Sequence, residues 1–292
     1  MRIPKEALLP YLGEDFHLEP LKPKSTIRIN ERKAPIKQKP TVEKLITKSG
    51  RLYKLYTAPT SENEEMQRIR KSVDSLKKLS CIPNIVAAES TFILAEYVDG
   101  EFPEFKSPDF VSAFARAAAA YHNLNKNDLD AKDFWDSNLV PSVKYLQQEH
   151  LIDLSVSKKI DTFSSRHLPP VFLSAFTYGD LTPQNFIVGV DGQLRLIDLG
   201  GFIDNTVIDL PLYSYHLAPL LDDMNFQRQY LNAGGPNQMY DHKIILRLIA
   251  VIDSAAAAHQ GFKFIHYSRF RKRRSRKQLI KRLVATIKEL VD

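Results

Sequence analysis

The chain has 292 residues, enough for one large or two smaller hydrophobic cores. Hydrophobic residues make up 43% and charged residues 26% of the sequence, which is typical of a globular protein and argues against a disordered chain. Cys81 is the only cysteine, so an intrachain disulfide is excluded, and we expect a reducing, cytoplasmic compartment with Cys81 as a small buried residue.

The net charge of +7 is unevenly distributed along the chain. The segments 22–54 and 263–282 contribute +9 and +10, which leaves −12 for the rest. An acidic middle suits Mg²⁺ and a cationic substrate, whereas the basic ends suit phosphate or an anionic surface. Charges and prolines fill the first residues, where a signal peptide needs an apolar core, so we expect no secretion signal.

The N-terminal part predicts a small antiparallel sheet. Four prolines lie within residues 1–26, which we expect to be an irregular lead-in. A first strand is predicted over 26–30, and a hairpin over 41–47 and 52–57 turns at Ser49-Gly50. The polar loop 31–40 between them contains no glycine, although it carries three lysines.

Further elements follow in chain order. Apolar residues at helical spacing predict a helix over 61–79, with a capping box formed by Ser61 and Glu64. Two strands are predicted over 82–89 and 91–97, a helix over 107–125, and a mostly helical interval over 124–173. His122, near the end of the helix over 107–125, is expected to be a packed structural histidine.

The stretch 176–202 concentrates the polar residues typical of a catalytic site. Two short apolar runs, 186–190 and 194–199, are separated by Asp191-Gly192, a strong signal for a two-residue hairpin. Asp180 and Asn185 precede the first run and Asp198 closes the second, so the hairpin can bring three polar side chains together. The alternative interpretation is purely structural: Asp180 and Asn185 would be turn-forming residues, and Asp198 would be a residue at the end of a strand.

These residues carry a resemblance to a known family. The sequence Tyr-Gly-Asp-Leu-Thr-Pro-Gln-Asn over 178–185, followed by Ile-Asp-Leu-Gly over 197–200, resembles the phosphotransferases of the aminoglycoside phosphotransferase and choline kinase type, relatives of the protein kinases. It is also similar to the lipopolysaccharide core sugar kinases. Tyr178 stands where these families have His, which is not their base and supports the loop.

The resemblance implies an α+β fold with two lobes, a small antiparallel-sheet N-lobe and a mainly helical C-lobe. The N-lobe would span 1–98, with the lead-in 1–26 and the nucleotide-binding sheet and helix 27–98. The C-lobe would span 99–292 and contain the catalytic loop 178–185, the metal-binding hairpin 186–200 and the basic C-terminal helix 263–292.

The resemblance also implies a role for individual residues, with ATP and Mg²⁺ as cofactors. Asp180 would be the catalytic base, and Asn185 and Asp198 would hold the metal. The nucleotide would be contacted by Lys54, by Glu65 through Lys54, and by the backbone of Glu96 and Val98. Glu62 is the alternative to Glu65, and both acids also suit the N-terminus of a helix. Trp135, Asp133 and Asp136 are weak candidates for the acceptor pocket, with a core position favoured for Trp135.

The C-terminal segment combines ten Lys or Arg within 263–282 with an apolar stripe at helical spacing. We expect the stripe to pack on the larger lobe and to leave the basic face in water. The alternative is attachment of the basic face to an anionic membrane surface. Nucleic acid is the least favoured binding partner, because few aromatic residues lie near the basic cluster.

The sequence therefore predicts an ATP-dependent kinase that moves the γ-phosphoryl group to a hydroxyl of a small molecule or sugar. The alternatives are a kinase of lipopolysaccharide core or another membrane-held glycolipid, and a catalytically weak kinase-like binding module. The expected location is cytoplasmic, with the inner membrane face as an option for the basic helix.

Overall fold

A computed structural model describes residues 3–21, 41–58, 60, 63–105, 107–179, 181, 183–207, 220, 222–263 and 270–292. Contacts group the chain into two compact units, which are described separately below. Unit 1 contains Met1–Tyr121 and Tyr178–Phe202, and unit 2 contains His122–Thr177 and Ile203–Asp292. The lobe boundary expected near residue 98 stays a prediction.

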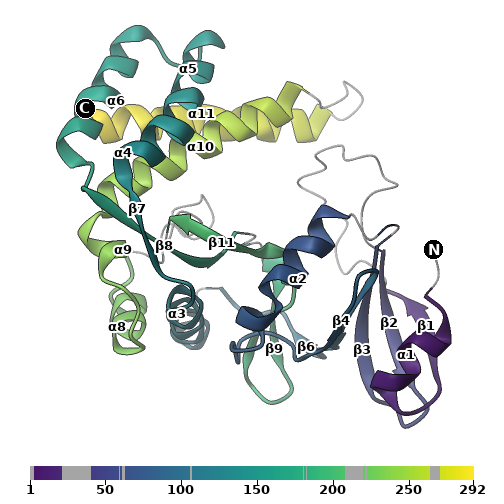
Figure 1. Cartoon of the computed structure of the whole chain (residues 1–292). Helices are drawn as coiled ribbons and strands as arrows, with labels where there is room; N and C mark the ends of the chain where they lie inside the picture. The colour runs from purple at the N-terminus through teal and green to yellow at the C-terminus, as the bar shows by residue number, and fades with distance from the viewer. Residues whose placement is uncertain are drawn as a thin grey trace. The chain divides into compact units, whose positions relative to one another are not determined.

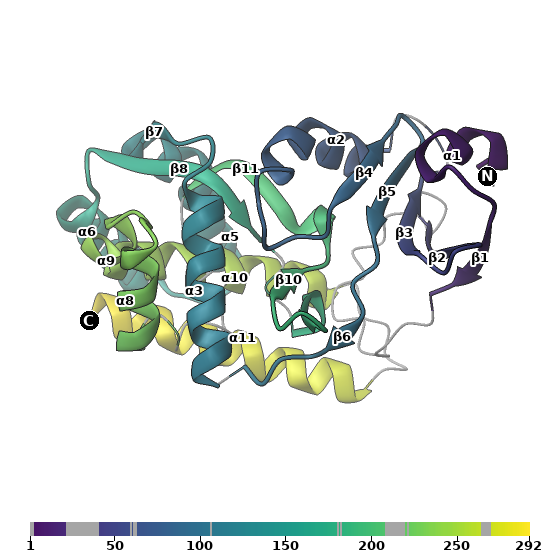
Figure 2. The ribbon, with the colours of Figure 1, turned by 90° about the horizontal axis from the view of Figure 1, so that it is seen from below.

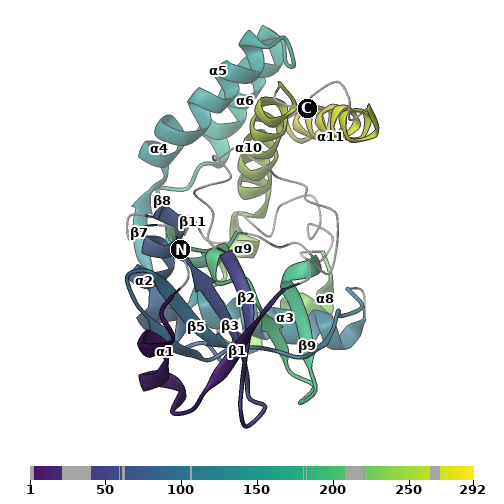
Figure 3. The same cartoon turned by 90° about the vertical axis from the view of Figure 1, so that its right-hand side faces the viewer.

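Unit 1 is built on an antiparallel sheet of five strands in the order β1-β2-β3-β5-β4. The strands are β1 (Phe16–Pro20), β2 (Thr41–Thr47), β3 (Leu52–Thr57), β4 (Ile85–Ala88) and β5 (Phe92–Glu96). The hairpin predicted over 41–57 is confirmed, as are the two strands that follow it. Figure 3 shows β1, β2, β3 and β5 side by side.

The prediction of an irregular lead-in over 1–26 is wrong, because this stretch holds α1 (Lys5–Leu12) and β1. Pro4 precedes the helix, where the missing N–H of a proline costs no hydrogen bond, and Leu8 and Leu12 lie one turn apart. Both leucines are buried in a cluster with Leu45 and Tyr53 on one face of the sheet, and Figure 2 shows α1 beside the strands. The strand predicted over 26–30 and the glycine-free loop 31–40 lie outside the described residues.

The predicted helix after β3 is α2 (Glu64–Leu76). Its N-cap is Asn63, whose side chain accepts a hydrogen bond from the N–H of Met66, so the helix begins later than the predicted Ser61 cap. Ser61 itself lies outside the described residues. The apolar face expected from the sequence is buried, and it consists of Met66, Ile69, Val73 and Leu76.

A second, three-stranded sheet of unit 1 contains the predicted hairpin. It has the order β10-β9-β6 and consists of β6 (Gly100–Glu101), β9 (Phe186–Gly189) and β10 (Leu194–Leu196). Short 3-10 turns flank the hairpin at η3 (Pro183–Asn185) and η4 (Leu199–Gly201). A Cβ on Gly100 would lie 2.0 Å from the carbonyl oxygen of Val188, so glycine is required for β6 to approach β9.

The helix α3 (Pro108–His122) packs against β9, the first strand of this hairpin. The Ser107 hydroxyl accepts a hydrogen bond from the N–H of Phe110, which confirms the predicted start of the helix. The rings of Phe110 and Phe114 meet Phe186 edge to face, with centroids 5.6 and 5.4 Å apart. The hairpin therefore rests on an aromatic cluster.

Unit 2 combines helices with a third sheet of order β11-β8-β7. The strands are β7 (Asn127–Asp130), β8 (Val171–Tyr178) and β11 (Phe202–Val207). The helices are α4 (Ala131–Phe134), the π-helix η2 (Trp135–Leu139), α5 (Val140–Gln148), α6 (Leu154–His167), α8 (Met224–Asn232), α9 (Gln238–Asp241), α10 (Lys243–Lys263) and α11 (Phe270–Val291). The interval 124–173 is thus helical in its middle, but it begins with β7, whose polar sequence carries no strand signal.

The last helix packs along α10 (Figure 1). Ile280, Leu283 and Ile287 of its apolar stripe are buried, whereas Lys281 and Arg282 are exposed. The prediction that the stripe packs and leaves a basic face in water is confirmed for this part of the helix. In the portion of the chain that the structure describes, no helix is long and apolar enough to cross a membrane.

Candidate active site

Lys54 reaches from the middle strand of the first sheet to the end of the hairpin. Side chains alternate along β3, so Tyr53 and Leu55 face α1 and Lys54 and Tyr56 face the other side. The Lys54 ammonium donates a hydrogen bond to the carbonyl oxygen of Ile197 at 2.9 Å, and the Tyr56 hydroxyl donates to the same oxygen at 3.2 Å. Two donors from β3 thus fix the residue that precedes Asp198.

The charge of Lys54 is set by two opposing effects. Burial lowers the pKa of its ammonium, because protein atoms replace water around it. The carboxylates of Asp198 and Glu65 act in the opposite direction and favour the charged form. Burial and the negative charge of Asp198 raise the pKa of Tyr56 well above 10, so its hydroxyl stays a neutral donor. Lys54, Glu65 and Asp198 therefore form one electrostatic cluster.

The helix α2 is attached to the turn that follows Asp198. The guanidinium of Arg68 donates to the carbonyl oxygen of Gly200 at 2.5 Å. A Cβ on Gly200 would lie 2.9 Å from Oε1 of Glu65, so a side chain there would displace the carboxylate. The Asp198 carboxylate accepts from the N–H of Gly200 at 3.1 Å. Glu65 and Arg68, one helical turn apart, both face this turn.

Asn185 and Asp198 lie at the same end of the hairpin. The N–H of Ile197 donates to the carbonyl oxygen of Asn185 at 2.9 Å, which continues the β9–β10 pairing and places Asp198 one residue further on. Asn185 is 8% exposed and Asp198 is half-buried. The predicted base, Asp180, lies outside the described residues.

The Asn185 amide and the Asp198 carboxylate are oxygen donors of the kind that could hold Mg²⁺. Among the described residues there is no group of three or more His, Cys, Asp or Glu that could hold a metal ion. Mg²⁺ prefers oxygen ligands, retains waters and is often bound by one or two protein side chains together with phosphate oxygens. A carboxylate and an amide oxygen beside a lysine are consistent with that mode.

Tyr178, which replaces the His of the related motif, is fully buried. Its ring packs against Phe202, with centroids 4.7 Å apart, and a Cβ on Gly201 would lie 2.6 Å from the ring. The N–H of Gly179 donates to the carbonyl oxygen of Gly201 at 2.7 Å. Tyr178 thus supports the start of the loop by packing.

The segment predicted to recognise adenine follows β5. The N–H groups of Glu96 and Tyr97 donate to the carbonyl oxygens of Asn84 and Leu52, at 2.9 and 3.0 Å. No other residue within the described ranges forms a backbone hydrogen bond with Val98. The backbone of Val98 is therefore available to a ligand, whereas the N–H of Glu96 is already used.

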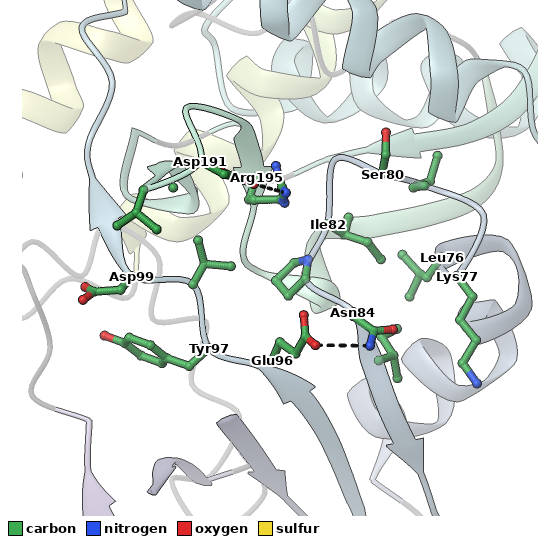
Figure 4. Close-up of a pocket in the computed structure, with 16 residues that line it drawn as sticks. Leu76, Lys77, Ser80, Ile82, Asn84, Glu96, Tyr97, Asp99, Asp191 and Arg195 are labelled. Atoms are coloured by element: carbon green, nitrogen blue, oxygen red, sulfur yellow. Dashed lines mark hydrogen bonds and ion pairs between the residues drawn. The ribbon is translucent and has the colours of Figure 1, made fainter. Parts of the chain in front are cut away.

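Glu96 and Val98 also line a cavity of about 420 Å³ (Figure 4). Its polar walls include the Arg195–Asp191 ion pair at 2.8 Å and a hydrogen bond of 3.4 Å from Asn84 to Glu96. Lys54, Glu65, Asn185 and Asp198 do not line it. Because Glu96 pairs with Tyr53 and Lys54 with Ala95, the Glu96 and Lys54 side chains leave opposite faces of the sheet, so the cavity and the Lys54 cluster are separate features.

Unit 2 contains the remaining candidates. Trp135 is buried at the start of η2, as favoured from the sequence, and Asp136 pairs with Lys132 at 2.5 Å. His122 is buried and its Nδ1 lies 2.9 Å from the Tyr230 hydroxyl, which confirms the expected structural role.

Sequence reasoning missed the contributions of Tyr56 and Arg68 to this site. Strand alternation places Tyr56 on the face of Lys54, and helical spacing places Arg68 three residues after Glu65. The sequence therefore indicated the face on which each side chain lies. It did not indicate that both side chains donate to the backbone of residues 197–200, because that contact is tertiary.

No protein-family profile and no curated protein sequence matches the chain. Solved structures do match it. A provisionally assigned fructosamine-3-kinase from Haemophilus somnus has a TM-score of 0.58 at 15% identity, over 97% of this chain and 96% of its own. An ethanolamine kinase from Plasmodium vivax has a TM-score of 0.55 at 14% identity, over 87% and 81% of the two chains. The ADP-bound aminoglycoside phosphotransferase APH(2'')-Ib has a TM-score of 0.53 at 15% identity, over 98% and 97%.

Similarity at this level of identity establishes a fold. The five-stranded antiparallel sheet, the helices that accompany it and these structural matches agree with the expectation from the sequence. The chain therefore has the α+β, protein-kinase-like fold shared by phosphotransferases of the aminoglycoside phosphotransferase and choline kinase type.

Proposed function

We propose that the protein is a kinase that transfers the γ-phosphoryl group of ATP to a hydroxyl of a small molecule or sugar. The observation that carries this proposal is the cluster in which Lys54 reaches Ile197 while Glu65 and Asp198 act on its ammonium. A partly buried cation under the influence of two carboxylates is the kind of site that phosphoryl transfer requires, since positioning and charge neutralisation supply most of the rate.

The cofactors in this proposal are ATP and Mg²⁺. Structural relatives support nucleotide use, since APH(2'')-Ib was solved with ADP and APH(2'')-IIa with streptomycin and ATP. Asn185 and Asp198 would hold the metal, whose bound form would neutralise negative charge on the phosphates. Lys54 would contact the phosphates, and Glu65 would orient Lys54.

The other residues have supporting roles in the same proposal. Asp180 would accept the proton of the acceptor hydroxyl. The backbone of Val98, together with Glu96, would recognise the base of the nucleotide. Tyr56 and Arg68 would position the strand end and the turn around Asp198, through their hydrogen bonds to Ile197 and Gly200.

The acceptor is proposed at the level of its class. The names of the structural relatives include ethanolamine kinase, fructosamine-3-kinase and macrolide 2'-phosphotransferase, which supports a hydroxyl of a small molecule. A membrane-held glycolipid sugar is the second candidate, favoured by the exposed Lys277, Lys281 and Arg282 of α11. Binding of the whole protein to anionic vesicles, compared with a Lys281→Glu/Arg282→Glu variant, separates the two.

The proposal is tested first by binding and then by turnover. The melting temperature of the wild-type chain should rise with ATP and Mg²⁺, because a ligand that binds only the folded state stabilises it. Asp198→Asn should lose most of the Mg²⁺-dependent part of that shift. Asp74→Asn, an exposed carboxylate of α2 that does not line the cavity beside Val98, is the control and should keep it.

Turnover is measured as ATP-dependent phosphorylation in a panel of hydroxyl compounds, and Asp180→Asn should abolish it while nucleotide binding remains. A wild-type chain that shows no shift at millimolar ATP would indicate a kinase-like binding module instead. Full activity in Asp180→Asn would remove Asp180 as the base.

A further inference from the structure

Lys44 occupies the position on β2 that is directly opposite Lys54 on β3. Residues paired in this way place their side chains on the same face of a sheet. The neighbours Leu45 and Tyr53 are also paired, and they are buried in the cluster with α1 on the opposite face. Lys44 and Lys54 therefore share the face that carries the candidate active site.

The ammonium groups of the two lysines lie against different partners. That of Lys54 donates to Ile197 O, near Asp198. That of Lys44 lies 4.8 Å from the ring centroid of Tyr97, in a cation–π contact. Tyr97 is tied to β3 by its N–H bond to Leu52 and precedes Val98, so Lys44 extends toward the segment proposed to recognise the base.

The two lysines bring like charges together on one face of the sheet. Like charges directly opposite on neighbouring strands repel one another. Among the described residues, neither ammonium forms an ion pair with a carboxylate: Asp198 and Glu65 act on Lys54 at longer range, and Glu19 of β1 is the strand partner of Lys44. A face that presents two ammonium groups without a direct ion pair is suited to a ligand with several negative charges.

The sequence between β1 and β2 adds a reason for such a role. It contains no glycine, the residue that most easily lets backbone N–H groups approach a phosphate. We infer that Lys44 is a second phosphate contact for a nucleoside di- or triphosphate, opposite Lys54, and that Tyr97 holds its ammonium until the nucleotide arrives. This inference rests on the proposed function.

The test is nucleotide binding by isothermal titration calorimetry with the full chain. Lys44→Gln should weaken ATP and ADP by about tenfold, the usual effect of losing one charge-assisted contact, and should leave adenosine unchanged. Lys44→Arg should retain most of the affinity. Lys48→Gln is the matched control, because Lys48 is exposed at the end of the same β2–β3 hairpin. Salt should weaken ATP binding less in Lys44→Gln than in the wild type.

The outcomes separate the inference from the proposed function. If the wild type binds ATP and Lys44→Gln binds it equally well, the Lys44 inference fails and the kinase proposal stands. An equal loss of affinity for ATP and for adenosine in Lys44→Gln would also overturn the Lys44 inference. The substitution would then act on recognition of the base or on the fold, and not on a phosphate contact. A wild type that binds none of these ligands contradicts the proposed function itself. If Lys44→Gln melts early, Lys44→Met, which keeps the apolar stem, is measured below both melting transitions.

Discussion

Two basic groups in this protein, the buried His122 and the partly buried Lys54, have opposite surroundings. His122 in unit 2 faces the neutral hydroxyl of Tyr230, and burial lowers the pKa of its imidazole to about 3. Burial also lowers the pKa of Lys54 in unit 1, but Asp198 and Glu65 oppose that effect. A buried base keeps its charge only when carboxylates accompany it. The charged cluster is suited to binding phosphate, whereas the neutral histidine contributes to packing.

The largest expected effect comes from removing the cation of the charged cluster. Lys54→Met should reduce Mg²⁺-dependent ATP turnover by about 10²–10³-fold, since preorganised charge at the phosphates is lost. The measurement is kcat/KM for ATP with a hydroxyl acceptor, or for ATP hydrolysis, in which water is the acceptor.

Lys71→Met is the control for Lys54→Met, because Lys71 is an exposed lysine of α2. It should leave turnover unchanged. The melting temperature of both variants shows whether either fold is lost. Equal turnover in Lys54→Met and the wild type would contradict the contrast between Lys54 and His122.

The neutral state of His122 should make the free energy of unfolding depend on pH. The imidazole pKa is about 3 in the folded chain and 6.5 for an ordinary histidine, so the unfolded chain binds a proton between these values that the folded chain does not. The free energy of unfolding should therefore fall as pH falls, by about 1.4 kcal/mol per unit, or about 2 kcal/mol from pH 6.5 to 5.

Urea unfolding at several pH values between 7 and 5 measures this effect in the wild type and in His122→Gln. The variant lacks the titrating group, so the stability difference between the two chains should shrink as pH falls. Parallel curves would show that His122 does not lose its proton on folding, and the comparison with Lys54 would then fail.

A smaller effect, on ATP binding, is expected when the Glu65 carboxylate near Lys54 is neutralised. Glu65→Gln should weaken ATP binding by about tenfold, because the ammonium loses one of the two charges that oppose its desolvation. Glu64→Gln is the matched control, one residue earlier and exposed on the same helix. If both variants bind alike, α2 does not orient Lys54 through Glu65, and the alternative residue Glu62 becomes the candidate to test.

The sequence by itself determined the elements with strong local signals. The hairpin around Asp191-Gly192, the β2–β3 hairpin and the apolar face of α2 follow from turn chemistry and periodicity, and all three are found. The predicted two-residue turn is wrong in length, because Gly189 pairs with Gln193 and leaves a three-residue loop, 190–192. The kinase-like fold was readable for the same reason, since its signature lies within one short stretch. The N-terminal helix and strand were missed because prolines outweighed the spacing of Leu8 and Leu12.

Only the tertiary structure decided how distant residues meet. Local pattern could place Lys54 on a strand, yet its bond to Ile197 spans 143 residues of sequence. The same holds for Arg68 at Gly200 and for the pairing that sets Lys44 opposite Lys54. Periodicity fixes which face a side chain occupies, but packing of the sheet, α2 and the hairpin fixes what that face meets.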